Sequence, residues 1–257
     1  MSKRSLDVDG TRNRLNALGL AYAAEQLEPV LSEAVKQGHA PHLVLDQLLD
    51  LEHQAREGRR VRTSLRLSSL PTGSTLADFD FAFQPAIERT RIETLATCAW
   101  IRSAETLLIQ GPPGVGKTHL AVGLAVKAVE HGFSAQFYRF DELKLQLKAD
   151  AHLPPARLRR RKYLSTALLV IDELGFEPMS RDEASLFFRL VTYRYGRGSI
   201  LITTNKSVRD WTELLAGDEA LAAAILDRLL HKANVLNIKG RSYRLRDLDT
   251  TLGTARA

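Results

Sequence analysis

The sequence predicts an α/β fold in its larger part, with a five-stranded parallel sheet lying between layers of helices. Two observations support this prediction. Short runs rich in apolar or β-branched residues alternate with longer stretches of helical pattern, as in strands joined by crossover helices. A glycine-rich loop directly follows the first run, and α/β sheets bind ligands beyond the carboxyl ends of their strands. The predicted strands are residues 106–110, 134–139, 167–171, 199–203 and 235–238.

A smaller helical domain is predicted before the sheet, because residues 11–58 have helical apolar periodicity throughout. Gly38 indicates the end of one helix, and Pro41 suits the first turn of the next. The apolar positions are Leu15, Leu18, Tyr22, Leu27, Val30 and Leu31, then Val44, Leu48, Leu51 and Ala55.

A linker is expected over residues 56–75, where cations, serines, Pro71 and Gly73 replace the apolar pattern. The predicted boundary therefore falls near residues 65–75. It gives a helical N-terminal domain with its linker (1–70) and a domain that contains the sheet (71–257). The tail after about Asp249 is short and polar, and we expect it to fray.

Composition narrows the classes of function. The formal charge of +6 and the pI of about 9.5 favour a polyanionic partner. The single cysteine, Cys98, excludes an intramolecular disulfide and fits a reducing compartment. No apolar run approaches the roughly 20 residues of a membrane span, and no apolar signal region follows residues 1–7. We therefore expect a cytoplasmic protein without a membrane partner.

Residues 111–118 read Gly-Pro-Pro-Gly-Val-Gly-Lys-Thr and match the phosphate-loop pattern G-x-x-x-x-G-K-[ST] at every fixed position. The glycines allow backbone N–H groups to surround a phosphate. Lys117 can then reach the β- and γ-phosphates, and the Thr118 hydroxyl can ligate Mg²⁺. The sequence therefore predicts nucleoside triphosphate binding. The cofactor-binding residues are Gly111, Pro112, Pro113, Gly114, Val115, Gly116, Lys117, Thr118 and His119.

Two acids at the end of a later apolar strand, Asp172 and Glu173, predict that the triphosphate is hydrolysed. Asp172 at the strand tip is expected to hold Mg²⁺ together with Thr118. Glu173 is placed to orient or deprotonate the attacking water. A solvated turn is the alternative for such an acid pair, but the phosphate loop that precedes it favours a hydrolase over a pure nucleotide switch.

Two further residues are candidates for sensing or completing the site. Asn205 follows the next predicted strand, where an amide can contact the γ-phosphate and the water, although a turn-forming asparagine is the alternative. Arg228 lies on a predicted amphipathic helix. It either reaches the phosphates of a neighbouring subunit or pairs with Asp227 or His231 on its own surface. No zinc-binding pattern and no Gly-x-Ser-x-Gly nucleophile elbow is present.

Together these motifs resemble an AAA+ ATPase and, more narrowly, the IstB family of transposition helper proteins. The resemblance covers nearly the whole chain and is most specific at residues 111–121, 170–176, 199–205, 226–231 and 240–245; residues 75–81 also resemble that family's N-terminal part. It implies that Lys117 and Thr118 belong to Walker A, and that Asp172 and Glu173 belong to Walker B. It also implies sensor 1 at Asn205, an arginine finger acting on a neighbour at Arg228, and ATP and Mg²⁺ as cofactors.

The resemblance also implies features beyond the core. Fewer than thirty residues follow Arg228, too few for the helical lid of most AAA+ proteins, and the IstB and DnaC families are alike in lacking it. Whether Arg244 replaces the lid's sensor arginine is left open. A helical insertion before Walker B, at residues 141–163, is similar to one in the DnaC and DnaA families that favours helical filaments.

Basic residues in that insertion are candidates for contact with the DNA backbone. Residues 157–162, here called the basic segment, hold five cations in six positions, and aromatic residues are not interleaved with them. A second basic stretch lies at residues 56–66; for both stretches a solvated charged face is the alternative. The predicted DNA-binding residues are Lys144, Lys148, Arg157, Arg159, Arg160, Arg161 and Lys162, with Arg59 and Arg60 from the second stretch.

The expected function is ATP-dependent assembly of a homo-oligomer on double-stranded DNA, which deforms that DNA and presents it to the transposase of the same insertion sequence. Two alternatives stay open. One is a replicative helicase loader resembling DnaC that acts on single strands. The other is a nucleotide-gated adaptor that seldom hydrolyses ATP.

Overall fold

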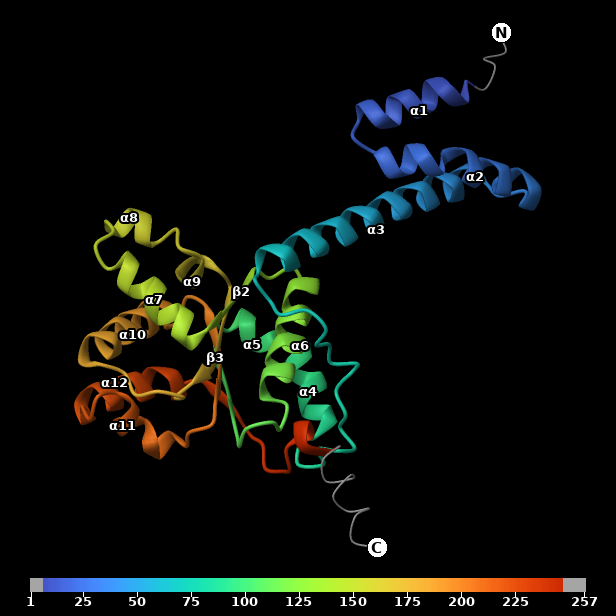
Figure 1. Cartoon of the computed structure of the whole chain (residues 1–257). Coiled ribbons are helices and arrows are strands. Elements are labelled where there is room, and N and C mark those ends of the chain that lie inside the picture. Colours follow the sequence, from blue (N-terminus) through green and yellow to red (C-terminus); the bar gives the residue numbers. More distant parts are fainter. Residues whose placement is uncertain (1–6, 247–257) are drawn as a thin grey trace, which may run out of the picture. The chain divides into compact units, whose positions relative to one another are not determined.

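The computed structural model describes residues 7–246 (Figure 1). The predicted tail after Asp249 lies outside this range. The chain divides into two compact units, residues 1–63 and 64–257, here called the N-terminal unit and the sheet unit. Among the described residues, no helix combines the length and the apolar character needed to cross a bilayer.

The N-terminal unit is formed by α1 (Val8–Ala17), α2 (Ala21–Gln37) and α3, which begins at Pro41 and ends at Leu67 in the sheet unit. Its small core buries Ala23, Leu27, Val30 and Leu48. Gly38 ends α2 with φ at +66°, a left-handed conformation that glycine adopts without steric cost. The predicted end at Gly38 and start at Pro41 are thus confirmed.

Two helical predictions for this part of the chain are wrong. Residues 11–37 are not one helix, because Gly19 takes a φ of +75° between α1 and α2. Leu18 consequently leaves the apolar face and is 73% exposed. The expected linker also begins too early, since α3 stays helical to Leu67. Arginine and leucine are good helix formers, so a run of cations did not mark a helix end.

All five predicted strands are confirmed within a few residues. They form a wholly parallel sheet in the order β2-β3-β4-β1-β5. The strands are β1 (Thr106–Gln110), β2 (Ala135–Arg139), β3 (Leu168–Leu174), β4 (Ser199–Thr204) and β5 (Ala233–Asn237). The central strands β1, β3 and β4 are buried almost throughout, which explains their continuous apolar runs.

Helices cover both faces of this sheet (Figure 1). On one face lie α6 (Lys117–Glu130) and α4 (Arg89–Ala96). On the other lie α7 (Phe140–Asp150), α10 (Arg181–Arg194) and α12 (Glu219–Leu230), whose apolar side chains form the main core with the strands. Shorter elements are α5 (Ala99–Arg102), α8 (Pro155–Leu158), α9 (Lys162–Ser165), α11 (Trp211–Leu214) and the 3₁₀ turns Val208–Asp210 and Tyr243–Leu245.

After β5 the chain returns to the glycine-rich loop. The backbone N–H of Ile238 donates to Gln110 (2.8 Å), and that of Tyr243 donates to Gly114 (2.9 Å). Between β5 and residue 246 the only helical element is the 3₁₀ turn, so no helical lid follows the sheet in the described part of the chain. The architecture is that of the predicted AAA+ core.

Candidate nucleotide-hydrolysis site

The phosphate loop connects β1 to α6 and is packed between two distant segments. Gly114 and Gly116 have φ values of +80° and +94°, which strongly favour glycine. A Cβ atom on Gly114 would lie 2.0 Å from the Ser242 hydroxyl oxygen, and one on Gly116 would lie 2.6 Å from the Phe79 ring. The motif's glycines are therefore required both by the turn and by the close approach of residues 79 and 242.

Lys117 is the first residue of α6 and points back over the loop. Its Nζ donates to the carbonyl oxygens of Gly111 and Pro112, each at 2.8 Å. Burial lowers the pKa of the Lys117 ammonium, and the nearby Asp172 carboxylate opposes that shift. Since neither partner carries a full charge, a phosphate would be a stronger partner than the carbonyl groups that Lys117 contacts here.

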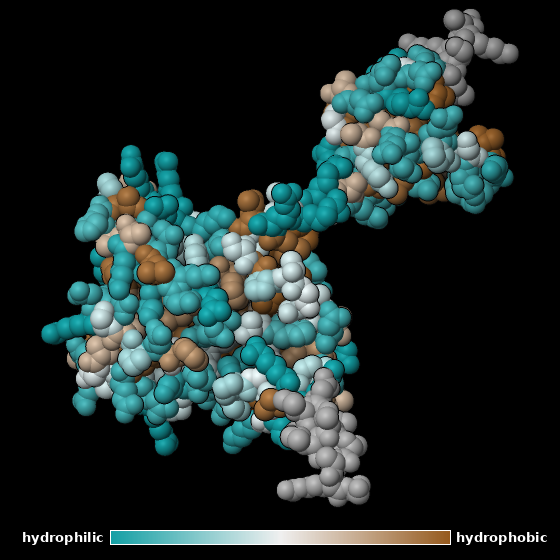
Figure 2. Space-filling view, in the orientation of Figure 1, coloured by the Kyte–Doolittle hydropathy of each residue, from teal (hydrophilic) through white to brown (hydrophobic). Residues whose placement is uncertain are grey.

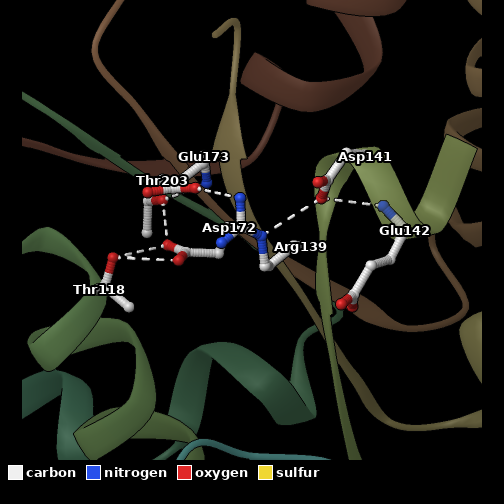
Figure 3. Close-up of polar contacts among 7 residues, drawn as sticks. All are labelled: Thr118, Arg139, Asp141, Glu142, Asp172, Glu173 and Thr203. Carbon is white, nitrogen blue, oxygen red and sulfur yellow. Dashed lines mark hydrogen bonds and ion pairs between the residues drawn. The ribbon is translucent and has the colours of Figure 1, made fainter.

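Asp172 lies on β3, buried at the sheet edge beside the loop, and three hydroxyl contacts hold its carboxylate (Figure 3). Thr118 Oγ1 donates across its two oxygens at 2.9 and 3.1 Å. Thr203 Oγ1, from β4, donates to Oδ1 at 2.5 Å and accepts from the Glu173 backbone N–H at 2.9 Å. Thr203 thereby fixes both acids, and no role had been predicted for it.

Glu173 follows in a strained position. Its φ is +60°, unusual for a residue with a side chain, and the β3–β4 register shifts between Ile171 and Leu174. The Glu173 side chain is about half exposed, between the buried residues Asp172 and Leu174. Its Oε2 lies 3.1 Å from Nη2 of Arg139, which ends β2 and also pairs with Asp141 at 3.4 Å (Figure 3). Nothing in the sequence had indicated this contact.

One cavity of about 550 Å³ brings the predicted groups together. Its wall includes Lys117, Thr118, Glu173 and Asn205 from the predicted site, and Arg244, whose role had been left open. Residues without a predicted role also line it, from the segment before α4, the loop after β3, the end of β4 and the end of the described chain. These are Ser74, Asp78, Phe79, Asp80, Gln84, Phe176, Thr203 and Tyr243.

The residues of this cavity fit a magnesium nucleotide. The start of α6 presents backbone N–H groups and the positive end of the helix dipole to it. The Thr118 hydroxyl and the Asp172 carboxylate supply hard oxygen donors of the kind that Mg²⁺ prefers. The volume lies within the range of small-molecule sites. His119, also predicted to bind the nucleotide, lines the cavity with its Nε2 2.7 Å from the Thr75 carbonyl oxygen.

Arg228 lies at the opposite edge of the sheet. It lines a cavity of about 150 Å³ together with Thr106 and Ile200, which stand at the amino ends of β1 and β4. Its Nη1 donates to the Ala224 carbonyl oxygen at 2.7 Å. In residues 7–246 it forms no ion pair with Asp227 or His231, and His231 instead contacts the Tyr195 hydroxyl at 3.0 Å. The structure thus does not bring Arg228 to its own phosphate loop.

The predicted DNA-binding cations fall into two groups: those with a protein partner, and those that are exposed and form no ion pair within residues 7–246. Arg161 is 2.5 Å from the buried Asp150 carboxylate, and Lys162 Nζ donates to the Leu67 carbonyl oxygen at 2.5 Å. Lys144 pairs with Glu177 and Glu183, and Lys148 pairs with Glu183. Arg59 pairs with Glu52, and Arg60 pairs with Glu57. Arg157, Arg159 and Arg160 are exposed and form no ion pair within residues 7–246.

Solved structures share this fold. The DnaC helicase loader matches with a TM-score of 0.50 and 28% identity, over 58% of this chain and 87% of that one. DnaA from Aquifex aeolicus bound to AMPPCP matches with a TM-score of 0.55 and 16% identity, over 72% of this chain and 56% of that one. The likeness to DnaA shows the fold alone.

Sequence relatives agree. The ATP-binding protein of insertion sequence IS21 from Pseudomonas aeruginosa is 42% identical, over 91% of this chain and 88% of that protein. That of IS5376 from Geobacillus stearothermophilus is 37% identical, over 79% and 80%. The phosphate loop and the acid pair Asp172–Glu173 lie in one site, and this chain is an ATP-binding AAA+ ATPase. The model of the IstB-like ATP binding proteins matches residues 13–250, and the chain belongs to that family.

Proposed function

We propose that this protein is a transposition helper that oligomerises on duplex DNA when ATP is bound. It deforms the DNA and delivers it as a target to the transposase of the same insertion sequence, thereby stimulating insertion. ATP hydrolysis between neighbouring subunits then resets the assembly.

The observation that carries this proposal is the separation of Arg228 from the cavity that it would serve. Lys117, Asp172, Glu173 and Asn205 meet at the carboxyl edge of the sheet, while Arg228 lies at the amino edge. A site whose arginine lies on the far side of its own sheet is incomplete until a second copy supplies that arginine. ATP would therefore join subunits as well as serve as substrate.

Within such a joint site, each residue has a role that its position supports. Lys117 would exchange its two carbonyl partners for phosphate oxygens. Mg²⁺, held by Thr118 and Asp172, would supply positive charge beside the phosphates. Glu173 would take a proton from the attacking water, and Asn205 would orient that water. Arg244, which faces the same cavity, would add a further cation to the phosphates.

Binding to DNA is supported by the net charge and by the basic segment. Hydrophilic side chains project around α8 (Figure 2), which contains Arg157 and directly precedes Arg159 and Arg160. Because these three arginines lack protein partners in the described chain, their charges are available to phosphates. The names of the relatives place them in insertion sequences, which supports the transposase as partner.

Mixing two inactive variants tests the joint site. Lys117→Ala damages a protomer's own phosphate site but leaves its Arg228 intact, and Arg228→Gln does the reverse. Each variant alone should hydrolyse ATP about 10³-fold more slowly on duplex DNA, or slower still. A mixture should recover activity, because some interfaces combine an intact Lys117 with an intact Arg228. Two Lys117→Ala preparations mixed in the same way are the control. Failure of the mixed variants to recover would refute a shared site.

A helicase loader is the second candidate, and the likeness to the DnaC helicase loader at 28% identity favours it. Strand preference separates the two. The transposition proposal predicts that ATP-dependent assemblies form more tightly on duplex than on single-stranded DNA of equal length. Negative-stain electron microscopy and fluorescence anisotropy would measure this. A clear preference for single strands would favour the loader.

A further inference from the structure

The guanidinium of Arg228 lies over the ring of Phe188, with its carbon 5.0 Å from the ring centroid. Phe188 belongs to α10, and Arg228 lies in the last turn of α12, which packs beside α10. A cation over the face of an aromatic ring is held by the ring's quadrupole. This contact joins the proposed trans-acting arginine to a residue that no motif includes.

Most N–H donors of Arg228 have no partner among residues 7–246. A guanidinium has five N–H donors in one plane, and one of them donates to the Ala224 carbonyl oxygen. An arginine paired with a carboxylate would commit two donors to that partner. Within residues 7–246 no carboxylate pairs with Arg228. The ring of Phe188 contacts the flat face, and that contact leaves the donors along the edge available for phosphate.

The helix that carries the Phe188 ring is packed tightly in the core. Phe188 is half-buried, and the preceding Phe187 is 1% exposed in the core between α10 and the sheet. Leu190 and Val191 on the same helix are equally buried. A capping box at Ser180 and Glu183 fixes the start of α10. The ring is therefore attached to a rigid helix, while the long arginine side chain would otherwise sample many rotamers.

We propose that Phe188 is the positioning residue for Arg228. The aromatic ring holds the guanidinium plane in one orientation before a second copy of the chain docks, so the free edge is ready for the triphosphate of that copy. This inference rests on the proposed function, in which Arg228 acts in trans. It adds that the rate of hydrolysis in the assembly depends on a ring that touches neither nucleotide nor metal.

A double-mutant cycle on the full chain tests the inference, with ATP turnover measured on duplex DNA at saturating protein. Phe188→Leu keeps an apolar side chain and removes the ring; it should lower kcat about 3–10-fold and leave the KM for ATP within about twofold. Phe188→Tyr restores the ring face and should return kcat to within about twofold of the parent. In an Arg228→Gln background, Phe188→Leu should change the residual single-turnover rate less than about twofold.

Tyr193→Leu is the matched control. It removes another ring of the same helix that lies under an arginine, since Arg197 is 4.8 Å from the Tyr193 centroid. It should leave kcat unchanged. The inference is overturned if Phe188→Leu behaves like the parent, or if it lowers turnover equally with and without Arg228. If Arg228→Gln alone hydrolyses ATP normally, the proposal that Arg228 acts in trans is wrong. That result is distinct from either outcome for Phe188.

Discussion

The phosphate loop and the basic segment are both candidates for binding phosphate, but the loop depends on its backbone shape and the segment on its side-chain charges. At the loop, φ values and close packing force the backbone into one shape, so the sequence motif and the geometry coincide. In the basic segment only side chains would bind phosphate, and tertiary contacts determine which of them are available. Of its five cations, Arg161 and Lys162 have protein partners, while the other three form no ion pair in residues 7–246.

The comparison shows that a site formed by the backbone can be predicted from the sequence residue by residue. For a site formed by charged side chains, the sequence predicts only the total charge. A run of arginines predicts electrostatic attraction to polyanions, but it does not say which arginines stabilise the fold. Four experiments test these assignments, in order of decreasing expected effect.

The largest effect is expected in the nucleotide cavity, at Glu173. Glu173→Gln should reduce ATP turnover about 10²–10⁴-fold, because the amide cannot accept the proton of the attacking water. ATP binding should persist, and assemblies on DNA should remain locked. Phosphate release and nucleotide binding by calorimetry would measure the two effects. Glu177→Gln is a suitable control, since that exposed carboxylate is 3.9 Å from Lys144 and does not line the cavity. Normal turnover in Glu173→Gln would mean that another group activates the water.

The next effect concerns the free arginines. Replacing Arg157, Arg159 and Arg160 by Gln should weaken duplex binding roughly 10–100-fold and reduce the slope of log affinity against log salt by about 2.7. Affinity titrations at several salt concentrations would show this. A variant with Arg189, Arg197 and Arg209 replaced by Gln loses the same charge from other exposed positions. Equal losses in both variants would mean that net charge, and not the basic segment, drives binding.

A smaller effect separates structural from free cations within the basic segment. Arg161→Gln removes a partner of the buried Asp150 carboxylate, which Tyr163 and Gln146 also contact. It should cost about 1–3 kcal/mol of unfolding free energy, while Arg160→Gln should cost less than about 0.5 kcal/mol. Urea unfolding followed by tryptophan fluorescence reports on this unit, because Trp100 and Trp211 both lie in it. Equal costs would contradict the division of the segment into two groups.

The smallest effect is expected in the N-terminal unit, where Glu52 engages Arg56 and Arg59. The backbone N–H of Ala23, the main cause, lowers the pKa of the buried Glu52 carboxylate from 4.5, and burial opposes the shift. A depressed pKa in the folded state means that its stabilisation is present above about pH 4.5 and is lost as pH falls through the folded value. The protection of the Tyr22 and Ala23 amides against hydrogen exchange, measured relative to the intrinsic rate at each pH, should therefore fall in acid.

Glu52→Gln supplies the control for that measurement. Its exchange at these two amides should be faster at neutral pH and should lack the acid-dependent step below pH 4.5. An unchanged acid step in the variant would show that another group is responsible.

The strands and the nucleotide site were accessible from sequence because each depends on local pattern. The five apolar runs became strands within a few residues, and Lys117, Thr118 and Asp172 lie together as expected. What escaped prediction depends on tertiary contact. Thr203 bridges Asp172 and Glu173 only because β4 lies beside β3, and Arg139 reaches Glu173 only because β2 does.

The helical predictions failed for a related reason. Apolar spacing continued through Leu18, yet a single left-handed residue, Gly19, separated the two helices. The Arg-rich end of α3 has the composition of a linker, but the carboxylate of Glu52 binds two of its arginines and the start of α2. That carboxylate is paired across thirty residues of sequence, which no local window contains.

The contacts of Phe79 and Ser242 with the glycines of the phosphate loop have a consequence for handling the protein. Phe79 and Tyr243, which follows Ser242, both line the cavity, so a bound nucleotide should shield both segments from proteases at the same time. Removing either segment would take away part of the cavity wall and should leave a folded sheet that no longer binds its nucleotide.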